Sequence, residues 1–163
     1  SMNLTTTCSE ATSAGSCGGS VSVGTAYCQA NVNSTGVTGV LSASGSAVVS
    51  ANDLTLEASS LPNNSFGFFL VGRDGGFIAN PGGSAGNLCL GGSIGRYVGP
   101  GQIKNAGASG TFSLLIDLTQ VPQPTGFTAI AGGQTWRFQN WHREAVGGTV
   151  TSNFTHGLEV SFL

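Results

Sequence analysis

The stretch Gly133–Glu144, GQTWRFQNWHRE, differs from the rest of the chain, in which charged residues make up only 7%. It contains both tryptophans, two of the five basic residues and one of the two histidines. Because successive side chains of a strand point to opposite faces, the stretch predicts an apolar face and a polar face. The first set is Trp136, Phe138, Asn140 and His142, and the second is Arg137, Gln139, Trp141 and Arg143.

The same two-residue period occurs elsewhere. In residues 47–59, AVVSANDLTLEAS, the apolar set is Leu54, Leu56 and Ala58 and the polar set is Asp53, Thr55 and Glu57. Further apolar runs lie at residues 65–79, 95–99, 110–119 and 157–163, separated by turn clusters such as NPGGSAGN. Within the first of these runs, Asp74-Gly75 predicts a tight hairpin turn. No segment keeps a helical period over ten residues, so we expect an all-β chain.

The expected architecture is a two-sheet antiparallel β-sandwich of about eight strands, jelly-roll-like or fibronectin-like. Residues 1–25 are polar, small and without a sustained period, which is typical of a linker or leader. Residues 26–163 then form the sandwich domain. The net charge of −2 and the single lysine argue against nucleic acid as a partner. No apolar run approaches the roughly 20 residues of a membrane helix, so we expect no membrane insertion.

Four cysteines, Cys8, Cys17, Cys28 and Cys89, occur without the paired spacing of a zinc site. Their even number in a Gly/Ser/Thr-rich chain predicts disulfides and a secreted or cell-surface protein. Three pairings are open, of which we favour Cys8–Cys17 within the leader and Cys28–Cys89 across the domain. The alternative is four free thiols in a cytosolic protein.

The order of several motifs resembles a known kind of domain. These motifs are YCQANVNSTG, ANDLTL, LCLGG, TWRFQNWHRE and a terminal LEVSFL, and they span residues 27–163. They are similar to a β-sandwich domain found at or near the C-termini of large secreted bacterial proteins. The resemblance implies an accessory domain with no established activity, in which Cys28 and Cys89 pair. Such domains tend to read Trp-Tyr-Arg-Asp where this chain has Trp141 to Glu144.

Trp141 falls among Arg and Gln on the polar face of its predicted strand. A tryptophan in that setting is typical of sugar binding, because the indole stacks on the apolar face of a sugar ring while its neighbours bond the hydroxyls. The alternative is a bulge near Asn140 that returns Trp141 to the core. Arg143 would then form an ion pair with Asp117.

These residues give two hypotheses for function. In the first, the domain is a non-catalytic, carbohydrate-binding accessory module with a polysaccharide as its ligand. Trp141 would stack on the sugar, Arg143 and Gln139 would donate hydrogen bonds, and Tyr97 or Arg96 would add a further contact. In the second, the chain is a structural or surface-attachment domain that packs against other domains of its parent protein, and both tryptophans would be buried.

A hydrolase is the third reading. His142 or His156 could be combined with a serine and with Asp53, Asp74 or Asp117 as a triad, but a serine-rich chain offers such combinations by chance. No GxSxG motif precedes a helical segment. We therefore expect no enzymatic activity.

No cofactor is expected, with the exception of a structural calcium ion. Calcium takes about six to eight oxygen ligands. Asn52, Asp53, Asp74 and the carbonyl groups of residues 79–87 could supply some of them, although no DxDxDG-type run is present.

Overall fold

The computed structural model describes residues 21–163, so the predicted Cys8–Cys17 pair lies outside the described residues. The described chain is all-β, as predicted, and two short 3₁₀ turns, η2 (Val49–Ala51) and η3 (Pro81–Gly83), interrupt it. The expected number of about eight strands was too low, because several strands have only two or three residues. The strands are β1 Ser22–Val23, β2 Thr25–Tyr27, β3 Val40–Ser44, β4 Thr55–Ser59, β5 Phe66–Ala79, β6 Asn87–Arg96, β7 Lys104–Asn105, β8 Phe112–Leu115, β9 Val121–Pro122, β10 Phe127–Thr128, β11 Thr135–Val146, β12 Thr149–Phe154 and β13 Gly157–Ser161.

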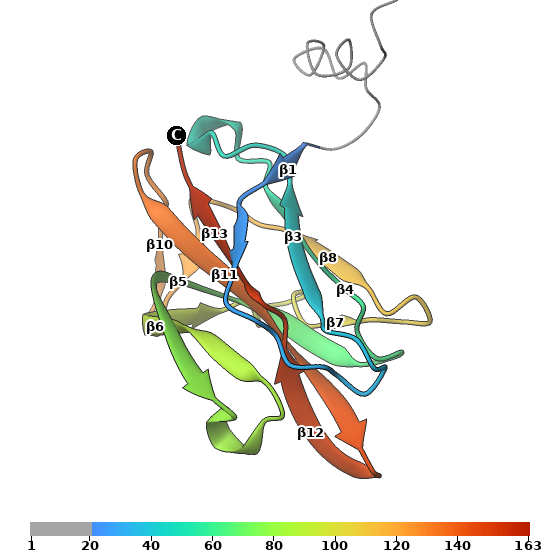
Figure 1. Ribbon diagram of the computed structural model, residues 1–163. Helices are drawn as coiled ribbons and strands as arrows, with labels where there is room; N and C mark the ends of the chain where they lie inside the picture. Colours follow the sequence, from blue (N-terminus) through green and yellow to red (C-terminus); the bar gives the residue numbers. More distant parts are fainter. Residues whose placement is uncertain (1–20) are drawn as a thin grey trace, which may run out of the picture.

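Two antiparallel sheets form the sandwich. The smaller has the order β1-β3-β4-β8, and the larger has the order β2-β13-β11-β5-β6, with β12 paired to β11 and β7 paired to β5. The β9–β10 hairpin stands apart from both. β1 and the start of β2 belong to the segment expected to be a leader, and they pair with β3 and β13. Figure 1 shows β11 running along the molecule and continuing with β12 as a two-stranded ribbon at one end.

The core between the sheets follows the alternation predicted from the sequence. Leu54, Leu56 and Ala58 are fully buried, and they belong to the same apolar cluster as Trp136 and Phe138 of β11. Pairing of β11 with β5 is unbroken over six consecutive residues, and its pairing with β12 continues to the end of the strand. The pairing shifts by one residue between Phe138, opposite Leu158, and Trp141, opposite Phe154, but the extra residue lies between β12 and β13, and β11 itself keeps its alternation. The alternative in which a bulge turns Trp141 into the core was therefore wrong.

The hairpin turn predicted at Asp74-Gly75 was also wrong. β5 continues through these residues, and its pairing with β6 shifts register between Gly72 and Asp74 and again between Gly75 and Ile78. The chain reverses later, at Asn80–Gly86. Glycines permit the bend: Gly92 has a φ of +61°, and a Cβ on Gly91 would lie 2.9 Å from the carbonyl oxygen of Gly75. The strands are therefore bent where a turn was expected.

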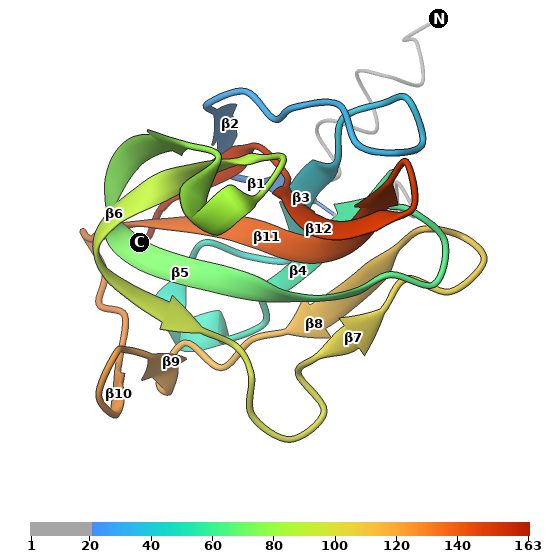
Figure 2. The same cartoon turned by 90° about the horizontal axis from the view of Figure 1, so that it is seen from below.

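Because of this bend, the first half of β6 lies over the outer face of β11. The backbone N–H of Cys89 donates to Gln139 Oε1, at 2.8 Å, and the Gln139 amide donates to the Asn87 carbonyl. Figure 2 shows the end of the β5–β6 hairpin on the side of β11 opposite to β4 and β8. We call this end, residues 77–90, the folded-back hairpin.

The predicted Cys28–Cys89 disulfide is confirmed, with its Cα atoms 6.3 Å apart. It joins the end of β2 to β6, and these strands stand at opposite ends of the larger sheet's order. The Tyr27 hydroxyl donates to the Cys89 carbonyl beside it, at 2.8 Å. The disulfide therefore fixes the folded-back hairpin to the far edge of the same sheet.

Within residues 21–163 no helix has the length and apolar character needed to cross a membrane.

Candidate binding groove

Three aromatic side chains form a row across the outer face of the larger sheet. Trp141 of β11 stands opposite Phe154 of β12 on one side and opposite Phe68 of β5 on the other. The rings of Phe68 and Trp141 are stacked, with centroids 5.0 Å apart and an angle of 29° between their planes. Adjacent strands place these rings about 5 Å apart in the sheet, so the contact follows directly from the register. We call these three residues the aromatic row.

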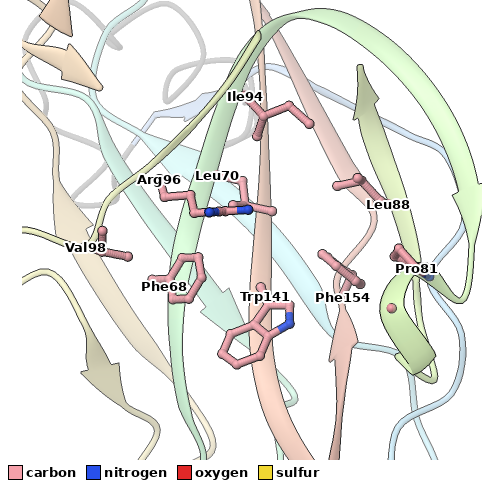
Figure 3. Close-up of a pocket in the computed structure, with 10 residues that line it drawn as sticks. Phe68, Leu70, Pro81, Leu88, Ile94, Arg96, Val98, Trp141 and Phe154 are labelled. Carbon is pink, nitrogen blue, oxygen red and sulfur yellow. The ribbon is translucent and has the colours of Figure 1, made fainter. Parts of the chain in front are cut away.

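The aromatic row and the folded-back hairpin together enclose a groove of about 620 Å³. Figure 3 shows Trp141 at one end of the groove and Ile94 at the other, with Phe68 and Val98 on one side of Trp141 and Phe154 and Pro81 on the other. Trp141 remains partly exposed. The rest of the lining is mainly apolar and consists of Leu70, Gly82, Ile94 and Arg96.

Two arginines flank the aromatic row. The Arg143 guanidinium carbon lies 5.5 Å from the centroid of the Trp141 ring, which is within the range of a cation–π contact. Arg96 lines the groove, and its Cα partner Leu70 lies two residues from Phe68 along β5. In register terms, Arg143 and Arg96 therefore lie two positions from the row, on opposite sides of it.

A second depression of about 390 Å³ continues the surface beyond Arg143. It is lined by Arg143, by residues 62–65 and by Phe66 and Val150, whose exposed fractions are 56% and 67%. Arg143 borders this depression and contacts Trp141, so it connects the two hollows. Together they form an extended surface along the strand direction.

Glu144 is the only carboxylate among the residues that line either hollow. Its side chain is buried, because even-numbered residues of β11 face inward. One carboxylate oxygen accepts a hydrogen bond from the Ser34 N–H at 2.6 Å, and the other accepts from Asn153 Nδ2 at 2.8 Å. Both oxygens are thus hydrogen-bonded inside the protein, and the groove itself is lined by Arg96 and by no carboxylate.

Two of the predicted ligand contacts are corrected by the structure. Gln139 is 0% exposed, because β6 covers it, and its amide makes three hydrogen bonds to the backbone of Cys89, Asn87 and Thr155. Tyr97 is buried in the core between the sheets, and burial raises the pKa of its hydroxyl. Neither side chain reaches the groove. Trp141, Arg143 and Arg96 remain at the site.

The ion pair considered for Arg143 and Asp117 does not form. The Asp117 carboxylate accepts hydrogen bonds from Thr119 and Asn52, and these bonds, led by the Thr119 hydroxyl, lower its pKa. Between residues 21 and 163, the only ion pair joins Arg137 to Glu159, at 2.6 Å.

Both histidines have structural positions. His142 is fully buried, its Nδ1 lies 3.0 Å from Asn140 Oδ1, and burial lowers its pKa to about 4. His156 Nε2 accepts the Leu41 N–H, which places its proton on Nδ1, where it donates to the Gly157 carbonyl. Neither is hydrogen-bonded to Asp53, Asp74 or Asp117, so the residues of the hypothetical triad are not brought together. In the described part of the chain, no three His, Cys, Asp or Glu residues are grouped as a metal site.

Phe68 was missed as a site residue. Phe154 was expected to contribute to binding only if it shared a face with Trp141, and the structure places it there. Alternation in residues 65–72 offered a signal for Phe68, because Phe69 and Val71 are buried in the core and the alternate residues, Phe68 and Leu70, must face outward. Leu88 and Pro81 gave no such signal, because their position depends on the bend in β5 and β6.

Comparison with known proteins gave no match. No protein-family model fits the chain, and no curated protein and no solved structure is significantly similar to it.

Proposed function

We propose that this domain is a non-catalytic binding module that holds a polysaccharide in the groove of the larger sheet. The observation that carries the proposal is the aromatic row, in which a partly exposed tryptophan is held in place by a phenylalanine on each neighbouring strand. A sugar ring has an apolar face of C–H groups, which matches a flat indole, and hydroxyls at its rim, which match guanidinium N–H donors. The domain would serve as an accessory part of a secreted or cell-surface protein.

The shape of the site favours a polymer as the ligand. The groove and the second depression follow one another along β11, with Arg143 between them. An elongated surface can contact several residues of one chain. Weak contacts to each sugar then add up through repeated engagement along the polymer.

The rival reading, a structural or surface-attachment domain, requires both tryptophans to be buried. Trp136 meets that requirement, since it lies in the core between the sheets. Trp141 does not, because it is partly exposed and lines a groove. This difference between the two tryptophans supports a binding role.

A titration of the tryptophan fluorescence with soluble plant and algal polysaccharides tests the proposal. We expect at least one polymer to shift the emission to the blue, because a stacked sugar shields the indole from water. Trp141→Ala should abolish the shift and the binding. Phe127→Ala is the matched control, since Phe127 is 67% exposed on β10 and lies outside the groove. Binding that survives in Trp141→Ala, or the absence of binding by any polymer, would overturn the proposal.

A further inference from the structure

We infer that the polysaccharide is anionic and that its carboxylate or sulfate groups bind to Arg96 and Arg143 while its rings stack on Trp141. This inference rests on the proposed function and adds the chemical class of the ligand.

Both guanidinium groups are exposed, and neither has a hydrogen-bonding partner among residues 21–163. In residues 21–163, neither Arg96 nor Arg143 donates a side-chain hydrogen bond or forms an ion pair. Arg137, by contrast, is paired with Glu159 on the same sheet. Guanidinium groups recognise carboxylates and sulfate-like oxyanions through two parallel N–H donors, which a neutral hydroxyl cannot match as well.

The charged residues that line the groove and the second depression complement an anionic ligand. The protein as a whole carries a net charge of −2, yet the groove is lined by Arg96 and no carboxylate, and the second depression is lined by Arg143 and one carboxylate, that of Glu144. The one acidic residue at the border, Glu144, has both oxygens bonded to Ser34 and Asn153. The two exposed guanidinium groups therefore outnumber the single buried carboxylate along this surface, and this balance favours an anionic ligand.

The position of the two arginines relative to the aromatic row also favours a charged polymer. They lie four register positions apart along the strand direction, which corresponds to about 13 Å, and two strands apart across the sheet, which corresponds to about 10 Å. Trp141 stands between them. A sugar chain that crosses the strands obliquely, from Arg143 on β11 toward Arg96 on β6, would stack one ring on Trp141 and bring the charged groups of neighbouring sugars to the two guanidinium groups. The arrangement suits a polymer in which anionic groups recur along the chain.

Matched pairs of polymers test the inference by isothermal titration calorimetry. The carboxylate arm compares carboxymethyl cellulose with hydroxyethyl cellulose, and the sulfate arm compares dextran sulfate with dextran. We expect the anionic member of at least one pair to bind about tenfold more tightly than its neutral partner or better, as one charge-assisted contact allows. The arm that shows the larger preference identifies the anionic group.

Arginine variants provide the second readout. Arg96→Gln and Arg143→Gln should each weaken binding of the anionic polymer by about tenfold, and the double variant should bind it no better than its neutral partner. Lys104→Gln removes one positive charge on β7, outside the groove, and should leave the affinity unchanged. Thermal unfolding of each variant shows that the fold is intact.

Three results would overturn the inference, and they can be told apart. Equal affinity for neutral and anionic polymers, with binding still lost in Trp141→Ala, would contradict the anionic ligand and leave glycan binding in place. No binding of any polymer would contradict the proposed function as well. Binding of polyacrylate, which has no sugar rings, with the same affinity as the anionic glycans would contradict both.

Discussion

The side chains of β11 alternate between two faces, and the surroundings of the two faces differ. On the inner face, Trp136 and Phe138 pack into one continuous core with the smaller sheet. On the outer face, four side chains in succession meet four different environments: Arg137 pairs with Glu159, Gln139 is buried beneath β6, Trp141 lines the groove and Arg143 is exposed beside it. The period of a strand assigns each residue to a face, but the elements that cover that face decide what the residue does.

The largest expected effect comes from removing the disulfide that fixes the folded-back hairpin over the outer face of β11. The disulfide joins two residues that are 61 apart in the sequence. Replacing both Cys28 and Cys89 by serine gives the unfolded chain more conformational entropy, which should lower the free energy of unfolding by about 4 kcal/mol. Thermal unfolding should show a decrease of roughly 10 °C in the melting temperature. Because the disulfide fixes the folded-back hairpin, the affinity for polysaccharide should fall as well.

An unchanged melting temperature in the double-serine variant would contradict the role given to the disulfide. A lower melting temperature with unchanged affinity would show that the folded-back hairpin stays in place without the disulfide.

A second variant tests the buried amide of the outer face. Gln139→Leu leaves the Cys89 N–H and the Asn87 and Thr155 carbonyls without their partner, so we expect a loss of about 3 kcal/mol in chemical denaturation. Gln120→Leu is the matched control, because Gln120 is exposed, and it should change stability by less than about 0.5 kcal/mol. If both variants lost the same small amount of stability, the hydrogen bonds of Gln139 would not hold β6 against β11.

His142 and Trp141 are neighbours in sequence on opposite faces, and His142 gives the inner face a dependence on pH. Its pKa of about 4 in the folded protein lies below the ordinary value of 6.5, because burial disfavours the charged ring. Below pH 6.5 the unfolded chain takes up a proton that the folded protein does not. The contribution of His142 to the free energy of unfolding should therefore be fully present above pH 6.5. It should fall as the pH drops toward 4, by about 2 kcal/mol at pH 5.

Denaturant unfolding of the native protein and of His142→Gln at a series of pH values measures this contribution. We expect the stability of the variant to change less between pH 6.5 and 4 than that of the native protein. The same slope in both proteins would contradict the assignment to His142.

The sequence predicts the face of a strand on which a side chain lies, but it does not predict which elements cover that face. Leu54, Leu56 and Ala58 face the core because alternation is a local property, and Trp141 lies on the outer face for the same reason. The burial of Gln139 could not be predicted, since it depends on contact with a strand about fifty residues away. That contact requires β5 and β6 to bend near Asp74, where the residues Asp-Gly indicated a turn.

The groove was unpredictable for the same physical reason. One wall is the aromatic row, which the registers of β5, β11 and β12 bring together. The opposite wall contains Pro81 and Leu88 of the folded-back hairpin, whose place is set by two register shifts and a disulfide. Sequence patterns indicate the direction of a side chain along its own strand, but they do not indicate how a distant hairpin bends over it.

The most direct test of the account is iodide quenching of Trp136→Phe, in which Trp141 is the only tryptophan left. We expect iodide to quench Trp141 in the free protein, and we expect a bound anionic polysaccharide to protect it. Trp141→Phe, which keeps only Trp136, should resist iodide with and without the polymer, because Trp136 lies in the core. If Trp141 proved as shielded as Trp136, or if no polysaccharide changed its quenching, the outer face of β11 would not be a binding site.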